Sequence, residues 1–198
     1  MTVICFLHLS AAMVPHVSRK DTSSVAMIHV LSERSIVQKD QQSHMADFHM
    51  GIYQTMFDQI TDKLENIYNS FCEEPFPVLK LNLYHRDEAS RARTVERIKA
   101  AGLETALALA ESTSLECSAK GIDKGVGLKK LCEHLGLPLE QTIAVGDADN
   151  DTMALKTAGL AVAMGNATEP IKALADVIVA DCDHNGCAEA IDKYLLAD

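Results

Sequence analysis

The sequence predicts an α/β protein in which helices flank a parallel sheet. Beyond residue 141, apolar runs alternate with amphipathic segments over short connections, which is typical of parallel βαβ units. An acidic cluster, GDADND, directly follows the apolar run at residues 143–145, as ligand-binding groups do at the carboxyl ends of parallel strands. The chain has 198 residues, 47% of them hydrophobic, so it can bury a core of this kind.

Residues 77–119 are expected to form a strand, a helix and two further strands. Leu79, Leu81 and Leu83 alternate with more polar residues, which is the pattern of a half-buried strand. Asp87 is suited to cap the helix that follows, and Gly102 is suited to end it. The predicted strands cover residues 78–84, 105–110 and 115–117, and the predicted helix covers residues 87–101.

The segment KGVGLKKLCEHLG, residues 124–136, predicts an amphipathic helix. Leu128, Leu131, Cys132 and Leu135 recur at helical spacing, and Gly136 ends the pattern. Strands and helices then alternate through the rest of the printed sequence. The predicted strands cover residues 142–145, 160–164 and 177–179, and the predicted helices cover residues 150–157, 168–174 and 186–195.

The first 76 residues show weaker patterns. We expect a strand over residues 2–9, a helix over residues 23–34 and a polar loop over residues 38–44. A series of apolar residues then recurs three or four positions apart, which predicts one long helix over residues 46–72. These residues are Phe48, Ile52, Met56, Ile60, Leu64, Ile67 and Phe71.

Composition excludes several classes of partner. The net charge of -10 and the pI of about 5.2 argue against a nucleic-acid-binding face, which needs a basic surface. No apolar run reaches the roughly 18 residues of a membrane span. A signal peptide has a basic residue before its apolar stretch, and none precedes the first apolar stretch of this sequence. Six scattered cysteines are typical of a reduced, cytoplasmic protein. The sequence indicates no particular oligomeric state.

The acidic cluster raises a physical question. Asp147, Asp149 and Asp151 lie within five positions, and two like charges about 4 Å apart cost roughly 4 kcal/mol at an effective dielectric constant near 20. A metal ion, a basic side chain or exposure to water must offset this repulsion. The segment KGIDKG, residues 120–125, supplies two candidate lysines, Lys120 and Lys124.

Three segments, in this order, resemble the haloacid-dehalogenase superfamily of phosphatases, and specifically its Cof-type branch. They are KGIDKG, IAVGDADND and GLAVAMGNA, the last followed by an Ala-Asp-Val strand and DHNGCAEAI. The resemblance covers residues 77–198. It implies a Rossmann-type parallel core with a reduced α+β cap. On this view residues 1–36 are an N-terminal part of the core, residues 37–118 the cap and residues 119–198 the C-terminal half of the core.

The resemblance also implies roles for individual residues. Asp147 and Asp151 would bind Mg²⁺, with the alternative that Asp151 holds the lysine in place. Lys124 would be catalytic, neutralising phosphate oxygens of a small phosphorylated metabolite such as a sugar phosphate, and Asn150 would contact the phosphoryl group. Lys120 is the rival for the role of Lys124. Simpler interpretations remain for three residues: Asp149 as a helix cap, and Asn166 and Asp183 as turn residues.

The printed sequence departs from the family at the nucleophile. It contains no Asp-x-Asp-Gly-Thr motif, although residues 6–14, FLHLSAAMV, align with that segment if His8 and Ser10 stand at the two aspartate positions. On this alignment residues 26–36 resemble the helix that follows. The sheet is then expected to be narrower than in the family, or completed by residues 2–9 or by another chain. Three functions follow: a Mg²⁺-dependent phosphatase, a non-catalytic relative that binds metal or phosphate, or a truncated gene product.

Overall fold

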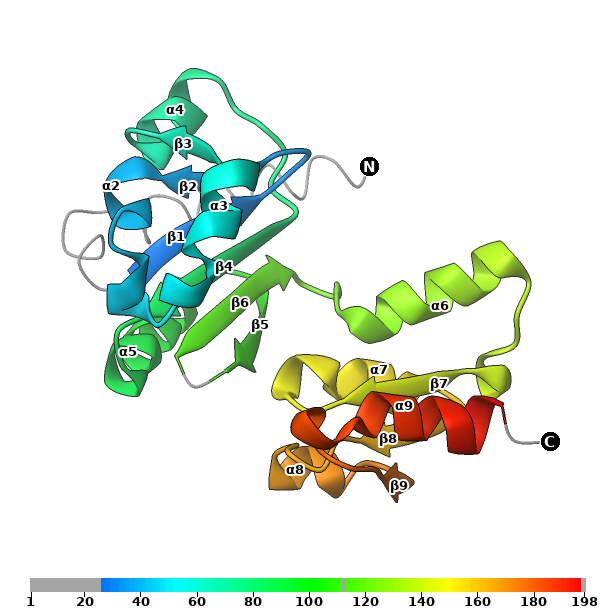
Figure 1. Cartoon of the computed structure of the whole chain (residues 1–198). Helices are drawn as coiled ribbons and strands as arrows, with labels where there is room; N and C mark the ends of the chain where they lie inside the picture. Colours follow the sequence, from blue (N-terminus) through cyan, green and yellow to red (C-terminus); the bar gives the residue numbers. More distant parts are fainter. Residues whose placement is uncertain (1–25, 112, 197–198) are drawn as a thin grey trace. The chain divides into compact units, whose positions relative to one another are not determined.

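The computed structural model describes residues 26–111 and 113–196, and the chain divides into two compact units (Figure 1). Unit 1 covers Met1–Lys120 and unit 2 covers Gly121–Asp198. The predicted division into residues 1–36, 37–118 and 119–198 stays a prediction. The strand predicted over residues 2–9, with His8 and Ser10, lies outside the described residues, so its alignment with the nucleophile motif stays a prediction.

Unit 1 is built on a six-stranded sheet with the order β3-β2-β1-β4-β6-β5. All of its strand pairs are antiparallel except β2–β3. The strands are β1 (Ala26–Leu31), β2 (Ser35–Gln38), β3 (Asp62–Leu64), β4 (Lys80–His85), β5 (Thr105–Ala110) and β6 (Ser114–Ala119). The described helices are α2 (Lys39–Gln42), α3 (Gln54–Ile60), α4 (Ile67–Glu73) and α5 (Glu88–Ala100), with 3₁₀ turns η1 (Met45–Phe48) and η2 (Gly51–Tyr53).

The sheet of unit 1 buries side chains on both faces. On one face β1, β4 and β6 pack against α4 and α5, with Leu83, Leu115 and Ile98 fully buried. On the other face Met27 and Val37 pack against η1 and α3. The predicted strands of residues 77–119 and the predicted helix are confirmed, and Asp87 caps α5 by accepting a hydrogen bond from the Ser90 amide at 2.6 Å.

The helix predicted over residues 23–34 is wrong, because residues 26–31 form strand β1. This strand lies between β2 and β4, and most of its residues are buried on both faces of the sheet. A strand covered on both faces has a continuous apolar run without alternation, and periodicity alone does not distinguish such a run from a buried helix. Residues 26–36 therefore share a sheet with residues 80–119.

The long helix predicted over residues 46–72 is also wrong. The segment forms η1, η2, α3, β3 and α4 in succession, and part of the predicted loop over residues 38–44 forms α2. The apolar stripe is not one buried face: Phe48 packs on one side of the sheet, and Ile67 and Phe71 pack on the other. Ile52 is 85% exposed. The regular spacing therefore arises by chance, from apolar residues that belong to two separate cores.

Unit 2 contains a parallel three-stranded sheet with the order β7-β8-β9 (Figure 1). Its strands are β7 (Ile143–Gly146), β8 (Leu160–Ala163) and β9 (Val177–Ile178). Its helices are α6 (Lys124–Leu135), α7 (Thr152–Thr157), α8 (Glu169–Lys172) and α9 (Gly186–Ala190). It also contains the 3₁₀ turns η3 (Leu139–Gln141), η4 (Asp149–Asp151) and η5 (Cys182–His184), and the π-helix η6 (Ile191–Leu195).

Helices cover both faces of the central strand of unit 2. Leu155 of α7 and Ile171 of α8 pack on one face of β8, and Ala190 of α9 packs on the other. This is the predicted α/β arrangement, and each predicted strand and helix of residues 124–195 is present in the predicted order. Gly136 ends α6 in the left-handed conformation with φ of 67°, which the absence of a Cβ permits.

Two findings bear on the predicted location. Among the residues that the structure describes, no helix is long and apolar enough to span a membrane. The described cysteines, Cys72, Cys117, Cys132, Cys182 and Cys187, are free. The cytoplasmic location itself stays a prediction.

Unit 1 is expected to lose stability in mild acid because of His29. Burial, and after it the charge of Lys80, lower the pKa of His29 from 6.5 to about 4. The unfolded chain binds the proton near pH 6.5, so the stabilisation is complete above that pH and is lost as pH falls toward 4. At pH 5 the loss is about 2 kcal/mol. Amide hydrogen exchange of β1 and β4, corrected for the pH dependence of the intrinsic exchange rates, measures this loss of stability.

The variant His29→Phe provides the control for this prediction. Burial also lowers the pKa of His85, so the variant is expected to keep a smaller decline of the same sign. If His29→Phe loses as much stability between pH 7 and pH 5 as the wild type, another group causes the acid sensitivity.

Candidate functional site

The candidate site lies at the carboxyl edge of the sheet of unit 2. Asp147 directly follows β7, Met164 follows β8 and Asp181 lies shortly after β9. The loops are joined by backbone hydrogen bonds, from the Met164 amide to the Gly146 carbonyl at 3.0 Å and from the Gly165 amide to the Ala180 carbonyl at 3.1 Å. Because the strands are parallel, their carboxyl ends meet at one edge, where ligands of α/β sheets bind.

Asp151 connects the lysine to the acidic loop. Its Oδ1 accepts from the Lys124 ammonium at 2.5 Å, and its Oδ2 accepts from the backbone amides of Asp147 at 3.1 Å and Ala148 at 3.5 Å. The Asp151 side chain is 13% exposed, whereas that of Lys124 is 51% exposed. Lys124 is placed by the start of α6, where Asp123 caps the helix by accepting from the Val126 amide at 2.9 Å.

Two glycines allow this close assembly. A Cβ added at Gly125 would lie 2.4 Å from the Met153 carbonyl oxygen, so α6 packs directly on the backbone of α7. A Cβ added at Gly146 would lie 2.5 Å from the Cβ of Asp151. The Lys-Gly and Gly-Asp pairs of the sequence therefore have a steric reason: Gly125 leaves room for the backbone of α7, and Gly146 leaves room for the Asp151 side chain.

Asp147 is exposed, and its side chain is held by Asn166, which the sequence predicted to be only a turn residue. Asn166 donates from Nδ2 to Asp147 Oδ2 at 3.0 Å and accepts at Oδ1 from the Cys182 amide at 3.0 Å. It thereby links the loops after β7, β8 and β9. Asn166 lies two residues past the apolar run that ends at Met164, and this position after a strand is the sequence signal that could have indicated the role.

The other candidates fall into two groups. Asn150 lies in η4 between Asp149 and Asp151, in the same loop as Asp147. Lys120 belongs to unit 1, where it forms an ion pair with Glu104 at 2.6 Å. Asp183 lies in η5 and donates its backbone amide to Asp181 at 3.0 Å. Lys124 lies in unit 2 and contacts Asp151 of the acidic loop.

The side chains of the site supply some, but not all, of the oxygen ligands that a cation such as Mg²⁺ needs. Within residues 26–111 and 113–196, no group of three or more His, Cys, Asp and Glu side chains is arranged to hold a metal. In the same part of the chain, Asp147 is exposed at the edge and only its Oδ2 accepts from a side chain, that of Asn166, while both Asp151 oxygens accept from protein donors. Mg²⁺ in proteins often uses one or two carboxylates, with waters and substrate phosphate completing the shell. This geometry favours Asp147 as a ligand and Asp151 as the group that holds Lys124.

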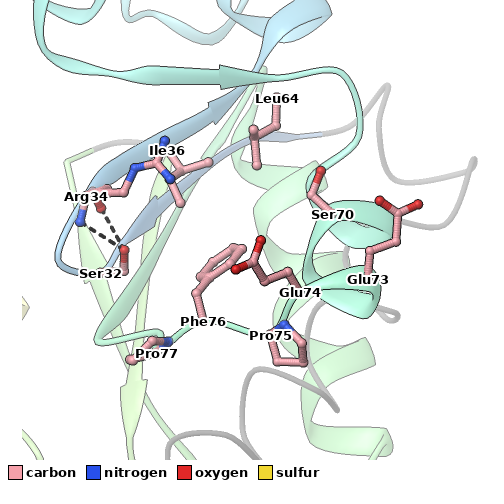
Figure 2. A pocket seen from close by; sticks show the side chains of 10 residues that line it. All are labelled: Ser32, Arg34, Ile36, Leu64, Ser70, Glu73, Glu74, Pro75, Phe76 and Pro77. Atoms are coloured by element: carbon pink, nitrogen blue, oxygen red, sulfur yellow. Dashed lines mark hydrogen bonds between the residues drawn. The ribbon is translucent and has the colours of Figure 1, made fainter.

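A separate groove of about 610 Å³ lies in unit 1 (Figure 2). Its lining combines apolar side chains such as Ile36 and Phe76 with the charged Arg34 and Glu74. Arg34 is already paired with Asp62 at 2.5 Å. Among the described residues that were predicted to carry chemistry, none lines this groove, so the candidate site is the edge of the sheet in unit 2.

Comparison with known proteins identifies the family. A sequence model of the haloacid dehalogenase-like hydrolases matches residues 17–191 of the chain. The chain belongs to the haloacid dehalogenase-like hydrolase family. This confirms the resemblance predicted from KGIDKG, GDADND and AMGNA.

Relatives of this haloacid dehalogenase-like hydrolase include phosphatases. Phosphatase YwpJ of Bacillus subtilis is 46% identical over 83 residues, 42% of this chain and 29% of that protein. The 5-amino-6-(5-phospho-D-ribitylamino)uracil phosphatase YcsE of the same species is 36% identical over 118 residues, 60% of this chain and 47% of that protein. The chain thus spans less than half the length of either relative.

Solved structures of the family share the fold. The HAD subclass IIB sugar phosphatase BT4131 matches with a TM-score of 0.73 at 22% identity, covering 96% of this chain and 67% of that one. The SMU.1108c protein of Streptococcus mutans matches with a TM-score of 0.73 at 22% identity, covering 96% and 68% of the two chains. These likenesses confirm the predicted α/β fold class.

Proposed function

We propose that this protein is a phosphatase that binds a small phosphomonoester, such as a sugar phosphate, together with Mg²⁺ at the carboxyl edge of the unit 2 sheet. One observation carries the proposal: Asp151 bonds both the Lys124 ammonium at 2.5 Å and the Asp147 amide at 3.1 Å. A cationic group and an exposed carboxylate are thereby held in one site. Phosphoryl transfer needs this combination, because charge must be neutralised around three equatorial oxygens.

Each residue has a distinct task in this proposal. Lys124 neutralises the phosphate oxygens, Asp151 fixes the position of its ammonium, and Asn150 contacts the phosphoryl group. Asp147 would hold Mg²⁺, oriented by the Asn166 amide at 3.0 Å. The bound Mg²⁺ would supply Lewis-acid stabilisation of the charge on the transferring group. The half-exposed Lys124 is accessible to a ligand from solvent, as binding of a soluble metabolite requires.

A second candidate is binding of metal and phosphate without turnover. The observation that favours it is the nucleophile: the printed sequence contains no Asp-x-Asp-Gly-Thr motif, and Asp147, Asp149 and Asp151 already form the acidic loop. Loss of a nucleophile lowers the rate of an enzyme by several powers of ten. Lys124 and Asp147 would then still bind phosphate and Mg²⁺.

A single set of measurements separates these functions. The purified chain is assayed with a panel of phosphomonoesters and Mg²⁺, beside Asp147→Ala and a Lys120→Ala control, and binding of inorganic phosphate is followed by NMR. Turnover that EDTA and Asp147→Ala abolish, and that Lys120→Ala retains, supports the phosphatase. Phosphate-induced shifts at the Asp147 amide without turnover support the binding function. Equal turnover in the wild type and Asp147→Ala, or no binding by folded protein, contradicts the proposed site.

A further inference from the structure

The residues that line the groove of unit 1 have no part in the proposed function. The groove runs between β2 and β3 on one side and the end of α4, with the segment before β4, on the other (Figure 2). Its volume of about 610 Å³ falls within the roughly 300–1,000 Å³ of small-molecule sites. Its lining residues belong to unit 1, whereas Lys124 and Asp147 belong to unit 2. The groove is therefore a separate cavity from the site assigned to phosphate.

One part of the lining is apolar and fixed in place. Ile36, Leu64 and Phe76 line the groove and pack in the hydrophobic core of unit 1. The ring of Phe71 meets the ring of Phe76 edge-on, with centroids 5.2 Å apart and an interplanar angle of 88°. A proline on each side of Phe76 also restricts the backbone there. An apolar ligand group therefore meets a surface that is already formed, which lowers the entropic cost of binding.

Arg34 presents a positive charge at one side of this apolar surface. Its Nε donates to Asp62 at 2.5 Å, whereas no hydrogen bond to another described residue engages its Nη1 or Nη2. The Ser32 hydroxyl fixes the turn, because it donates to the Arg34 carbonyl and accepts from the Arg34 amide, both at 3.0 Å (Figure 2). A guanidinium can bind a carboxylate through two parallel hydrogen bonds. Arg34 is therefore placed to receive a carboxylate.

Glu73 and Glu74 present negative charge at the other side. Glu73 is the last residue of α4 and Glu74 is its C-cap, and the last turn contains no basic residue. Both side chains are exposed, and no ion pair with another described residue engages either of them. The helix dipole makes negative charge unfavourable at this end, so a cation is stabilised there. Figure 2 shows the Glu74 carboxylate beside Phe76 and the Glu73 carboxylate directed away, so Glu74 is the group placed to receive a cation.

The charges of Arg34 and Glu74 act on each other across the groove. Asp62 has the largest effect on the pKa of Arg34, which it raises through a hydrogen bond and its charge, and the charge of Glu74 raises that pKa further. A ligand with a single charge is attracted by Arg34 or Glu74 and repelled by the other. A ligand that carries both charges on a small apolar body satisfies both groups and the apolar surface at once.

We propose that the groove binds a free α-amino acid with an apolar side chain. The carboxylate accepts from Arg34 Nη1 and Nη2, the ammonium donates to the Glu74 carboxylate, and the apolar side chain packs on Phe76. The Ser70 hydroxyl, which also lines the groove, can donate to the carboxylate or accept from the ammonium. The inference does not depend on phosphatase activity, because none of these residues lies in unit 2.

The test is a titration of the full chain with L-phenylalanine and two analogues that each lack one charge. The methyl groups of isoleucine and leucine are labelled with ¹³C, and each compound is added up to about 50 mM, well above a Kd of roughly 1 mM. We expect L-phenylalanine to shift the Ile36 and Leu64 signals saturably and to leave Ile171 of unit 2 unchanged. If neither signal shifts in folded protein, the proposal is overturned.

The analogues separate charge recognition from apolar contact. Phenylethylamine lacks the carboxylate and phenylpropionate lacks the ammonium, so each is expected to bind about tenfold more weakly than L-phenylalanine. If either analogue binds as tightly as L-phenylalanine, or more tightly, the groove does not recognise both charges and the assignment to amino acids is overturned.

Variants assign the two charges to residues. Arg34→Gln and Glu74→Gln are each expected to weaken L-phenylalanine about tenfold, the effect of one charge-assisted hydrogen bond. Glu33→Gln is the matched control and should leave affinity unchanged, because Glu33 is exposed in the same turn and does not line the groove. Arg34→Gln should not weaken phenylethylamine, which has no carboxylate for Arg34 to bind. Unchanged affinity for L-phenylalanine in either folded variant contradicts the site. If a variant does not fold, the comparison of the three compounds on the wild type decides.

Discussion

Replacing Gly125 with alanine is expected to destabilise unit 2 by about 3 kcal/mol. The added Cβ would lie 2.4 Å from the Met153 carbonyl oxygen and 2.7 Å from the Thr157 hydroxyl oxygen. Met153 contributes backbone atoms, which no rotamer change can move aside, so α6 must shift away from α7. That shift also separates Lys124 from Asp151, which lies directly before α7. The substitution is therefore expected both to lower the stability of unit 2 and to disrupt the contact between Lys124 and Asp151.

The same helix contains a matched control. A Cβ added at Gly127 would meet nothing within 4 Å, so Gly127→Ala is expected to stabilise the helix by about 0.5–1 kcal/mol. The chain has two units, so the free energy of unfolding is best measured by hydrogen exchange of the β8 amides, which report on unit 2. If Gly125→Ala and Gly127→Ala have similar effects, helix propensity and not the contact between α6 and α7 decides the result.

The sequence predicted unit 2 well because its signals are local. Strands β7 to β9 are short apolar runs, and α6, which precedes them, begins and ends at the capping residues Asp123 and Gly136. Each parallel strand is followed by a helix that packs on the same sheet. The order of elements along the chain therefore specifies the layers in space.

Unit 1 was harder to predict because its contacts are between distant segments. β1 is central only because β4, which lies 49 to 59 residues later at the paired positions, pairs with it from Ala26↔His85 to Leu31↔Lys80. Nothing within residues 26–31 indicates that partner. In residues 46–72 the spacing of apolar side chains resembled a helix, yet Phe48 and Phe71 belong to opposite faces of the sheet.

The candidate site was predicted in part. The sequence motifs identified Lys124, Asp147 and Asp151, and these residues are joined in one hydrogen-bonded group. They did not decide whether Asp151 binds metal or holds the lysine, because that depends on which oxygens are already engaged. The link from Asn166 to Asp147 also went unassigned, since a turn asparagine and a bridging asparagine look alike in sequence.

Asp151→Asn is expected to destabilise unit 2 by about 3 kcal/mol and to leave the response to Mg²⁺ intact. The carboxylate is mostly buried and accepts from Lys124 at 2.5 Å and from the Asp147 amide at 3.1 Å. An asparagine can present its oxygen to only one of these donors, and its NH₂ group then faces the other. Hydrogen exchange of the β8 amides measures the loss of stability.

Asp147→Asn provides the contrasting variant. Its side chain is exposed, so the substitution is expected to change stability by less than about 0.5 kcal/mol. Mg²⁺ that binds the folded protein raises its stability by RT ln(1 + [Mg²⁺]/Kd). If Asp147 is the ligand and Asp151 holds Lys124, added Mg²⁺ stabilises the wild type and Asp151→Asn but has no effect on Asp147→Asn. If Asp151→Asn also loses the response to Mg²⁺, Asp151 is itself a metal ligand, and Lys124 and Mg²⁺ compete for its carboxylate.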